Sequence, residues 1–193
     1  MVVTFATNII LARLLTPYEF GQIGIIMFFI MLANVFTEGG LGGALVRKAE
    51  VTKEDYASVF VFNLLVSILC FSLLVIFSGA IAHYYKDDAL KNLLTVTGLI
   101  LLINAFQMTQ NARMLREMKF KRKSIYTFSA VLGASVIGIV LAVKGFGVWS
   151  MVVMQLLIAA FTTVLFILGE GAYFSLSFSK KSFKELYGFG VTT

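Results

Sequence analysis

The chain has 193 residues, of which 59% are hydrophobic and only 13% are charged, and its net charge is +6. A soluble domain usually contains roughly 25% charged residues, so this composition excludes most soluble folds and disordered chains. With a single Cys, the chain is also no disulfide scaffold. Because backbone polar groups must be satisfied inside a bilayer, long apolar runs cross it as helices. The composition therefore predicts an all-α, polytopic transmembrane helix bundle.

The first apolar stretch, Met1–Ala12, is short and ends at Arg13, and we expect it to be the remainder of a longer helix. Five runs without an acidic or basic residue follow, each near the roughly 20 residues needed to cross the hydrocarbon core. They are residues 20–37, 56–82, 92–112, 124–143 and 145–169. We therefore expect a bundle of about six spanning helices over residues 1–178. Residues 179–193 are expected to be a cytoplasmic linker and the start of a seventh helix, with a second bundle missing.

Capping signals mark where two of these helices begin. In Thr16-Pro17-Tyr18-Glu19, Thr16 can accept a hydrogen bond at the N-cap, Pro17 suits the first helical position, and Glu19 can return a bond. The segment from Thr52 to Asp55 resembles a weaker capping box before the third helix. The sequence thus predicts helix starts near residues 17 and 53.

A glycine-rich segment follows Glu38 at the end of the second helix. Its glycines are Gly39, Gly40, Gly42 and Gly43. One interpretation is a helix stop and a tight loop, and the other is a hinge that bends during transport. Glu38 is then either an interfacial acid or a protonatable residue that couples ion movement to transport.

Basic residues are distributed unevenly along the predicted helices. Twelve of the 16 Lys and Arg residues lie in residues 47–53, 113–123 and 180–184, which the predicted spans place on one side. The positive-inside rule assigns this side to the cytoplasm. We therefore expect a multi-pass protein whose N-terminus is cytoplasmic.

The residues that usually carry catalysis or bind metals are scarce. His83 is the only histidine, the sequence has no metal-binding motif, and it has no phosphate-binding glycine loop after a strand. Ser135 lies in the middle of a predicted helix with no His to activate it, and its neighbours Gly133 and Gly138 are better explained by helix packing. We expect no enzymatic activity, no catalytic residue, no metal and no cofactor.

Polar side chains follow one face of the predicted helix over residues 92–112. They are Thr97, Asn104, Gln107 and Asn111. Four other helices carry amides, at Asn8, Asn34, Asn63 and Gln155. The amides either line a water-filled lumen or join helices by hydrogen bonds. In a lumen, the stripe should face Asn8 or Gln155 and lack partners on neighbouring helices.

Basic side chains near the predicted spans have two interpretations each. Arg13 either extends to the interface or faces a lumen and attracts an anion. The cluster over residues 113–123 sets the orientation and contacts anionic lipid, and it can also gather a phosphate-bearing substrate.

The segment Ile10–Gly21, with the sequence ILARLLTPYEFG, resembles the N-terminal signature of the Wzx-type polysaccharide flippases of the multidrug/oligosaccharidyl-lipid/polysaccharide exporter superfamily. Three further segments match in order, at Glu38–Arg47, Phe120–Arg122 and Gly145–Val152. The family often has Asp-Leu-Gly where this chain has Glu38-Gly39-Gly40. The resemblance covers nearly the whole chain.

The resemblance implies a transporter with two helix bundles that rock to give alternating access. Such proteins move undecaprenyl-diphosphate-linked sugar repeat units across the bacterial plasma membrane, the inner membrane, for surface polysaccharide biosynthesis. The implied partners are the lipid-linked sugar, membrane lipid and other polysaccharide assembly proteins, with no nucleic acid. Two alternatives stay open: a small-molecule exporter of the same superfamily, which would need buried acids, and a non-transporting membrane scaffold subunit.

The resemblance and the residue patterns together single out three groups of candidate residues. Candidates for the substrate lumen are Asn8, Arg13, Asn104, Gln107, Asn111 and Gln155. Candidates for binding the pyrophosphate or the lipid head group are Arg47, Arg113, Arg116, Lys121 and Arg122. Candidates for coupling or for a hinge are Glu38, Gly39, Gly40, Gly42 and Gly43.

Overall fold

The computed structural model of the chain describes residues 2–38, 41–48, 51–171 and 179. This part forms helices and contains no strand. The helices are α1 (Val2–Leu14), α2 (Pro17–Glu38), α3 (Leu41–Arg47), α4 (Lys53–Tyr85), α5 (Ala89–Arg116), α6 (Phe120–Val143) and α7 (Val148–Glu170). All except α1 and α3 are long and apolar enough to cross a membrane, and α1 is a shorter apolar helix. The predicted all-α, polytopic membrane bundle is confirmed.

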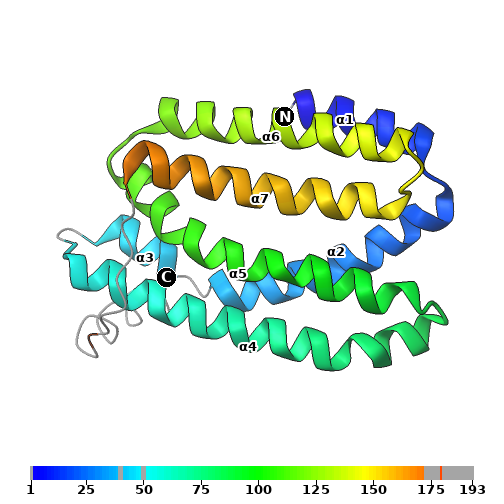
Figure 1. The fold of residues 1–193 in the computed structure, drawn as a ribbon. Helices are drawn as coiled ribbons and strands as arrows, with labels where there is room; N and C mark the ends of the chain where they lie inside the picture. The colour runs from blue at the N-terminus through cyan, green and yellow to red at the C-terminus, as the bar shows by residue number, and fades with distance from the viewer. Residues whose placement is uncertain (1, 39–40, 49–50, 172–178, 180–193) are drawn as a thin grey trace.

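Helix α5 lies at the centre of the bundle, where it packs against α2, α4 and α7, while α1 packs against α6 (Figure 1). The long helices run side by side and alternate in direction. Helix α3, the α5–α6 turn and the C-terminal end of α7 therefore lie together, and we call this the basic end. The turns at residues 15–16, 86–88 and 144–147 form the far end.

Both predicted capping boxes are present and explain where α2 and α4 begin. The backbone N–H of Thr16 donates to the Glu19 carboxylate at 2.7 Å, and the N–H of Glu19 donates to the Thr16 hydroxyl at 3.3 Å. At α4, the N–H of Thr52 donates to Asp55 at 3.0 Å, and the N–H of Asp55 donates back to Thr52 at 3.2 Å. These bonds satisfy N–H groups that helix starts leave without partners.

The glycine segment after α2 is partly helical, which the sequence did not predict. Gly42 and Gly43 lie inside α3, a short helix whose Ala44 and Leu45 are buried against α4 and α5. A Cβ added at Gly42 would lie 2.7 Å from Cε of Met108, whereas one at Gly43 would meet no atom within 4 Å. Gly42 therefore allows a close approach of α3 to α5.

Small residues bring the long helices close together. A Cβ at Gly138 of α6 would lie 2.9 Å from Cβ of Met154 in α7, and one at Gly133 would lie 3.6 Å from the ring of Phe161. The predicted packing role is confirmed for Gly138, whereas Gly133 leaves room for an ordinary Cβ contact with Phe161. The hydrophobic effect does not drive helices together in lipid, so close van der Waals contacts of this kind stabilise the packing of membrane helices.

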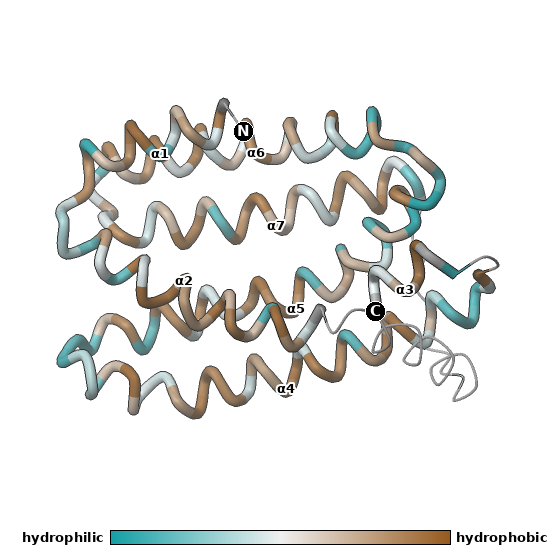
Figure 2. The backbone as a smooth tube through the Cα atoms, turned by 180° about the vertical axis from the view of Figure 1, so that it is seen from behind, coloured by the Kyte–Doolittle hydropathy of each residue, from teal (hydrophilic) through white to brown (hydrophobic). Residues whose placement is uncertain are grey.

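The outer surface of the bundle is apolar between its two ends, as expected for helices that contact lipid. Large side chains such as Phe28, Met31 and Ile76 are exposed along the helices. Hydrophilic residues gather at the turns of both ends, as Figure 2 shows, and the segments between them are mostly hydrophobic. The chain is therefore a multi-pass membrane protein.

The orientation can be tested with single cysteines at exposed turn positions. In a Cys70→Ala background, Asp88→Cys and Lys144→Cys at the far end should react with a membrane-impermeant thiol reagent added to intact cells. Lys121→Cys at the basic end should react only after the membrane is opened, because the positive-inside rule places this end in the cytoplasm. The reverse pattern of labelling would contradict the expected orientation.

Candidate functional site

A polar cavity of about 230 Å³ lies between α2, α4 and α5, and we call it the amide cavity. It is lined by Asn34, Thr37, Asn63, Ser67, Asn104, Ala105, Gln107, Met108 and Asn111. None of these described lining residues is charged. The volume is enough for several water molecules, and the walls supply both donors and acceptors.

The structure brings three of the predicted lumen residues together. Asn104, Gln107 and Asn111 all line the amide cavity, as their shared face of α5 predicts. The opposite walls carry Asn34 from α2 and Asn63 from α4, which the sequence marked only as single amides in their helices.

Three other predicted lumen residues are not among those that line the amide cavity. Asn8 and Arg13 are exposed on α1, and Gln155 is half-buried on α7. The amide stripe therefore faces α2 and α4 and not the sides that carry Asn8 or Gln155. The physical reason is helix packing, because α1 packs against α6, and α5 contacts α7 through residues other than those that line the amide cavity. A role of these three residues in a larger lumen stays a prediction.

Hydrogen bonds inside the cavity are sparse. The Asn104 side-chain N–H donates to Oδ1 of Asn34 over a long 3.4 Å, and Nδ2 of Asn63 donates to the Met108 sulfur at 2.8 Å. Three buried oxygens of the amide cavity have no hydrogen-bond partner among the residues that the structure describes. They are Oδ1 of Asn63, Oγ of Ser67 and Oδ1 of Asn111.

These oxygens determine what the cavity can bind. A buried acceptor without a partner costs roughly 1–3 kcal/mol, so it is stabilised by any donor that reaches it. Water or the hydroxyl groups of a ligand can supply that donor. The cavity is thus neither a fully paired contact between helices nor an apolar core, and it is suited to a neutral ligand rich in hydroxyl groups.

The basic side chains of the α5–α6 turn contact acidic residues in the protein. Nζ of Lys119 lies 2.5 Å from carboxylate oxygens of both Glu117 and Glu170, and Arg122 lies 3.1 Å from Glu170. Nε of Arg113 donates to Glu117 at 2.7 Å. Hydrogen bonds from Lys119 and Arg113 hold the pKa of Glu117 below its ordinary value. This network joins the end of α7 to the start of α6.

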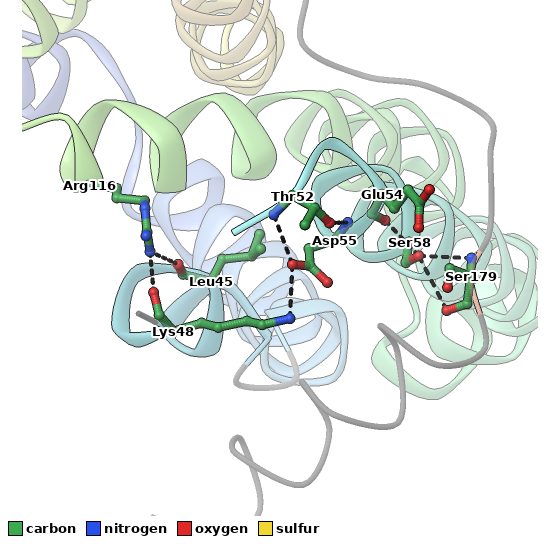
Figure 3. A network of polar contacts seen from close by, with 8 residues as sticks. All are labelled: Leu45, Lys48, Thr52, Glu54, Asp55, Ser58, Arg116 and Ser179. Atoms are coloured by element: carbon green, nitrogen blue, oxygen red, sulfur yellow. Dashed lines mark hydrogen bonds and ion pairs between the residues drawn. The ribbon is translucent and has the colours of Figure 1, made fainter. Parts of the chain in front are cut away.

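Arg116 ties α3 to the bundle, as Figure 3 shows. Its guanidinium donates to the backbone carbonyls of Leu45 and Lys48 at the end of α3. Lys48 in turn forms an ion pair of 2.9 Å with Asp55, whose carboxylate completes the capping box of α4. A cation at carbonyls that a helix end leaves unpaired is stabilising. The position of α3 against α4 and α5 is therefore maintained by charges at the basic end.

The predicted anion-binding residues thus differ in their surroundings. Arg113, Arg116 and Arg122 have partners within the protein, and Lys121 is exposed on α6. Gly39 and Gly40 lie outside the described residues, as do the side chains of Glu38 and Arg47. Binding of a pyrophosphate by this group stays a prediction.

Sequence reasoning missed several residues of the cavity. Asn63 and Ser67 are four residues apart on α4, and Asn34 and Thr37 are three apart on α2, so each pair shares a helix face. That spacing was a usable signal. Met108 was missed because an apolar side chain among amides has no distinctive pattern.

Comparison with known proteins relates the chain to proteins of bacterial polysaccharide biosynthesis. The sequence model of a family described as "Polysaccharide biosynthesis protein" matches residues 10–193. The chain is 28% identical over 156 residues to the succinoglycan biosynthesis transport protein ExoT of Rhizobium meliloti (strain 1021), an alignment that covers 81% of this chain and 31% of the relative. No solved structure matches the chain significantly.

Two further relatives come from other bacteria. An uncharacterised membrane protein of the cps region of Klebsiella pneumoniae is 27% identical over 134 residues, which is 69% of this chain and 28% of the relative. The teichuronic acid biosynthesis protein TuaB of Bacillus subtilis (strain 168) is 23% identical over 164 residues, which is 83% of this chain and 34% of the relative. The chain spans about a third of the length of these relatives.

The close approach of α3 to α5 predicts that two adjacent glycines respond differently to a larger side chain. Gly42→Leu should give a lower free energy of unfolding than Gly43→Leu, by about 1 kcal/mol, because its side chain must move the flexible end of Met108 while both variants gain the same helix propensity. Gly43→Leu is the matched control, since its side chain enters open space in the same helix. Thermal unfolding of the purified variants in detergent measures the difference, and equal shifts for the two variants would contradict the packing described here.

Proposed function

This chain belongs to the family of polysaccharide biosynthesis proteins, and we propose that it forms part of a transporter that moves a lipid-linked oligosaccharide across the bacterial plasma membrane. The product would serve surface polysaccharide biosynthesis. The names of two relatives support a role in polysaccharide biosynthesis, since one is a succinoglycan biosynthesis transport protein and another is a teichuronic acid biosynthesis protein.

The observation that carries the proposal is the amide cavity with its unsatisfied oxygens. A sugar presents many hydroxyl groups, and each can donate to one amide oxygen while it accepts from another amide. Oδ1 of Asn63 and Oδ1 of Asn111 lack donors among the described residues, and the bond between Asn104 and Asn34 is long enough to be exchanged. A passing sugar can form such neutral hydrogen bonds and leave again, because each contributes only about 0.5–1.5 kcal/mol.

The alternatives fit the cavity less well. A small-molecule exporter of the same superfamily would need a buried acid, and no acidic residue is among the described residues that line the amide cavity. A scaffold subunit is expected to pair its buried amides across helices, because unpaired ones destabilise it. The unpaired oxygens of Asn63, Ser67 and Asn111 favour a cavity that is filled by a ligand or by water.

The remaining parts of the proposal concern the whole transporter. Residues 1–178 would form the first of two bundles, and the second would correspond to a part of the relatives that this chain does not match. The two bundles would give alternating access. The basic end would face the cytoplasm, where the exposed Lys121 would meet the diphosphate of the lipid carrier.

Replacing cavity amides by Leu tests this function. In cells that depend on the full-length protein, Asn63→Leu and Asn104→Leu should each reduce surface polysaccharide by about tenfold, the effect of losing about 1.4 kcal/mol of transition-state stabilisation. The lipid-linked intermediate should accumulate, and protein abundance should be unchanged. Asn92→Leu is the matched control, because Asn92 is an exposed amide on α5, the helix of Asn104, and lies outside the cavity.

Two outcomes would count against the proposal. Normal export by Asn63→Leu and Asn104→Leu would remove the amide cavity from the transport path. A loss of export that follows a loss of protein in the membrane would assign these amides a structural role, as the scaffold alternative expects.

A further inference from the structure

A second cavity adjoins the amide cavity at the basic end, and we call it the α3 cavity. Its volume is about 310 Å³, and it is lined by Gly42, Gly43, Val46, Met108, Asn111, Ala112 and Leu115. Two residues, Met108 and Asn111, line both cavities. Since Gly43 and Val46 are exposed, the α3 cavity reaches the surface of the protein at the basic end.

The Met108 side chain occupies the boundary between the two cavities. Its sulfur accepts a hydrogen bond from Nδ2 of Asn63 on the amide-cavity side. Its terminal methyl group packs against Gly42 on the α3 side, where a Cβ would come within 2.7 Å. Met108 is thus placed between α4 and α3, and the absence of a side chain at residue 42 makes the space for it.

The contacts that hold Met108 are easily exchanged. A thioether is a weak hydrogen-bond acceptor, so a water or hydroxyl oxygen can replace it as the partner of Asn63. Methionine is unbranched and has three rotatable bonds, so the side chain can turn aside without moving the backbone of α5. Asn111 would then continue the polar wall from one cavity into the other, with its buried Oδ1 available to a donor.

We propose that the two cavities are one passage from the basic end and that Met108 divides it, limiting the size of the polar group that reaches the amide cavity. Small polar molecules would pass the side chain in its observed position. A group as large as a disaccharide would need Met108 to turn aside. The role in choosing a sugar head group rests on the proposed function, whereas the division of the passage does not.

The division can be tested by thiol labelling, which does not depend on transport. Ser67→Cys in a Cys70→Ala background places a thiol in the amide cavity with little change in side-chain size. The full-length protein in membrane vesicles is treated with a small reagent, trimethylammonium-ethyl methanethiosulfonate, or with a maleimide that carries a disaccharide. Met108→Ala should raise the rate of modification by the large reagent about tenfold, which corresponds to lowering the barrier by about 1.4 kcal/mol. The small reagent should react at a similar rate in both proteins.

Matched variants separate size from other effects. Met108→Leu keeps the volume of the side chain nearly unchanged and should behave like the original protein, while Met108→Val serves as a second, smaller variant if Met108→Ala is not produced. Val46→Cys lies in the α3 cavity and should react independently of residue 108. The acceleration should occur only from the membrane side at which Val46→Cys reacts.

The proposal is overturned if the large reagent modifies Ser67→Cys equally fast with Ala and with Leu at residue 108, or if it reacts with neither. Its failure is distinct from failure of the proposed function. Normal export by Asn63→Leu together with the expected labelling would reject the sugar path and leave Met108 as the boundary between the cavities.

Discussion

The structure depends on one constraint, which is that polar groups within a bilayer must find partners inside the protein. The helices satisfy the backbone. Several side-chain hydroxyl groups form a hydrogen bond within their own helix by donating to the backbone carbonyl one turn earlier. Thr97 donates to Leu93 at 2.7 Å, and Thr162 donates to Ile158 at 2.7 Å. An amide has two polar ends and needs partners beyond its own helix, so the amides of α2, α4 and α5 determine where the bundle has polar space.

Charges obey the same constraint by staying at the ends of the helices. Glu170 ends α7, where its side chain is only 4% exposed and contacts Lys119 and Arg122. Arg116 uses its charge on the carbonyls that end α3. The basic residues that orient the protein in the membrane thus also hold α3 beside the amide cavity, which connects the topology of the chain to the geometry of its candidate site.

Much of this fold was predictable from the sequence, because the length of apolar runs and the capping residues are local signals. The runs without charge located the five long helices, and Thr16 and Thr52 located two starts. Helix α3 was not predictable, because its glycines are weak helix formers and it is stabilised by tertiary contacts to Ala112 and Tyr56. The amide stripe of α5 was visible in the spacing of Asn104 and Asn111, but its facing walls depend on which helices pack against α5, and that order is not a local property.

The most direct test of the central claim compares two ligands of the purified full-length protein. A polyprenyl diphosphate that carries the oligosaccharide and the same lipid without sugar differ in the hydroxyl-bearing groups and in one ionisable oxygen of the terminal phosphate, which is free in the bare lipid. The account predicts that the glycosylated lipid binds more tightly and that Asn111→Leu reduces this difference by up to about tenfold, the effect of one lost hydrogen bond of about 1 kcal/mol or slightly more. Binding of the bare lipid diphosphate should be unaffected. A preference for the glycosylated lipid that is fully retained in Asn111→Leu would contradict the claim that the amide cavity receives the sugar.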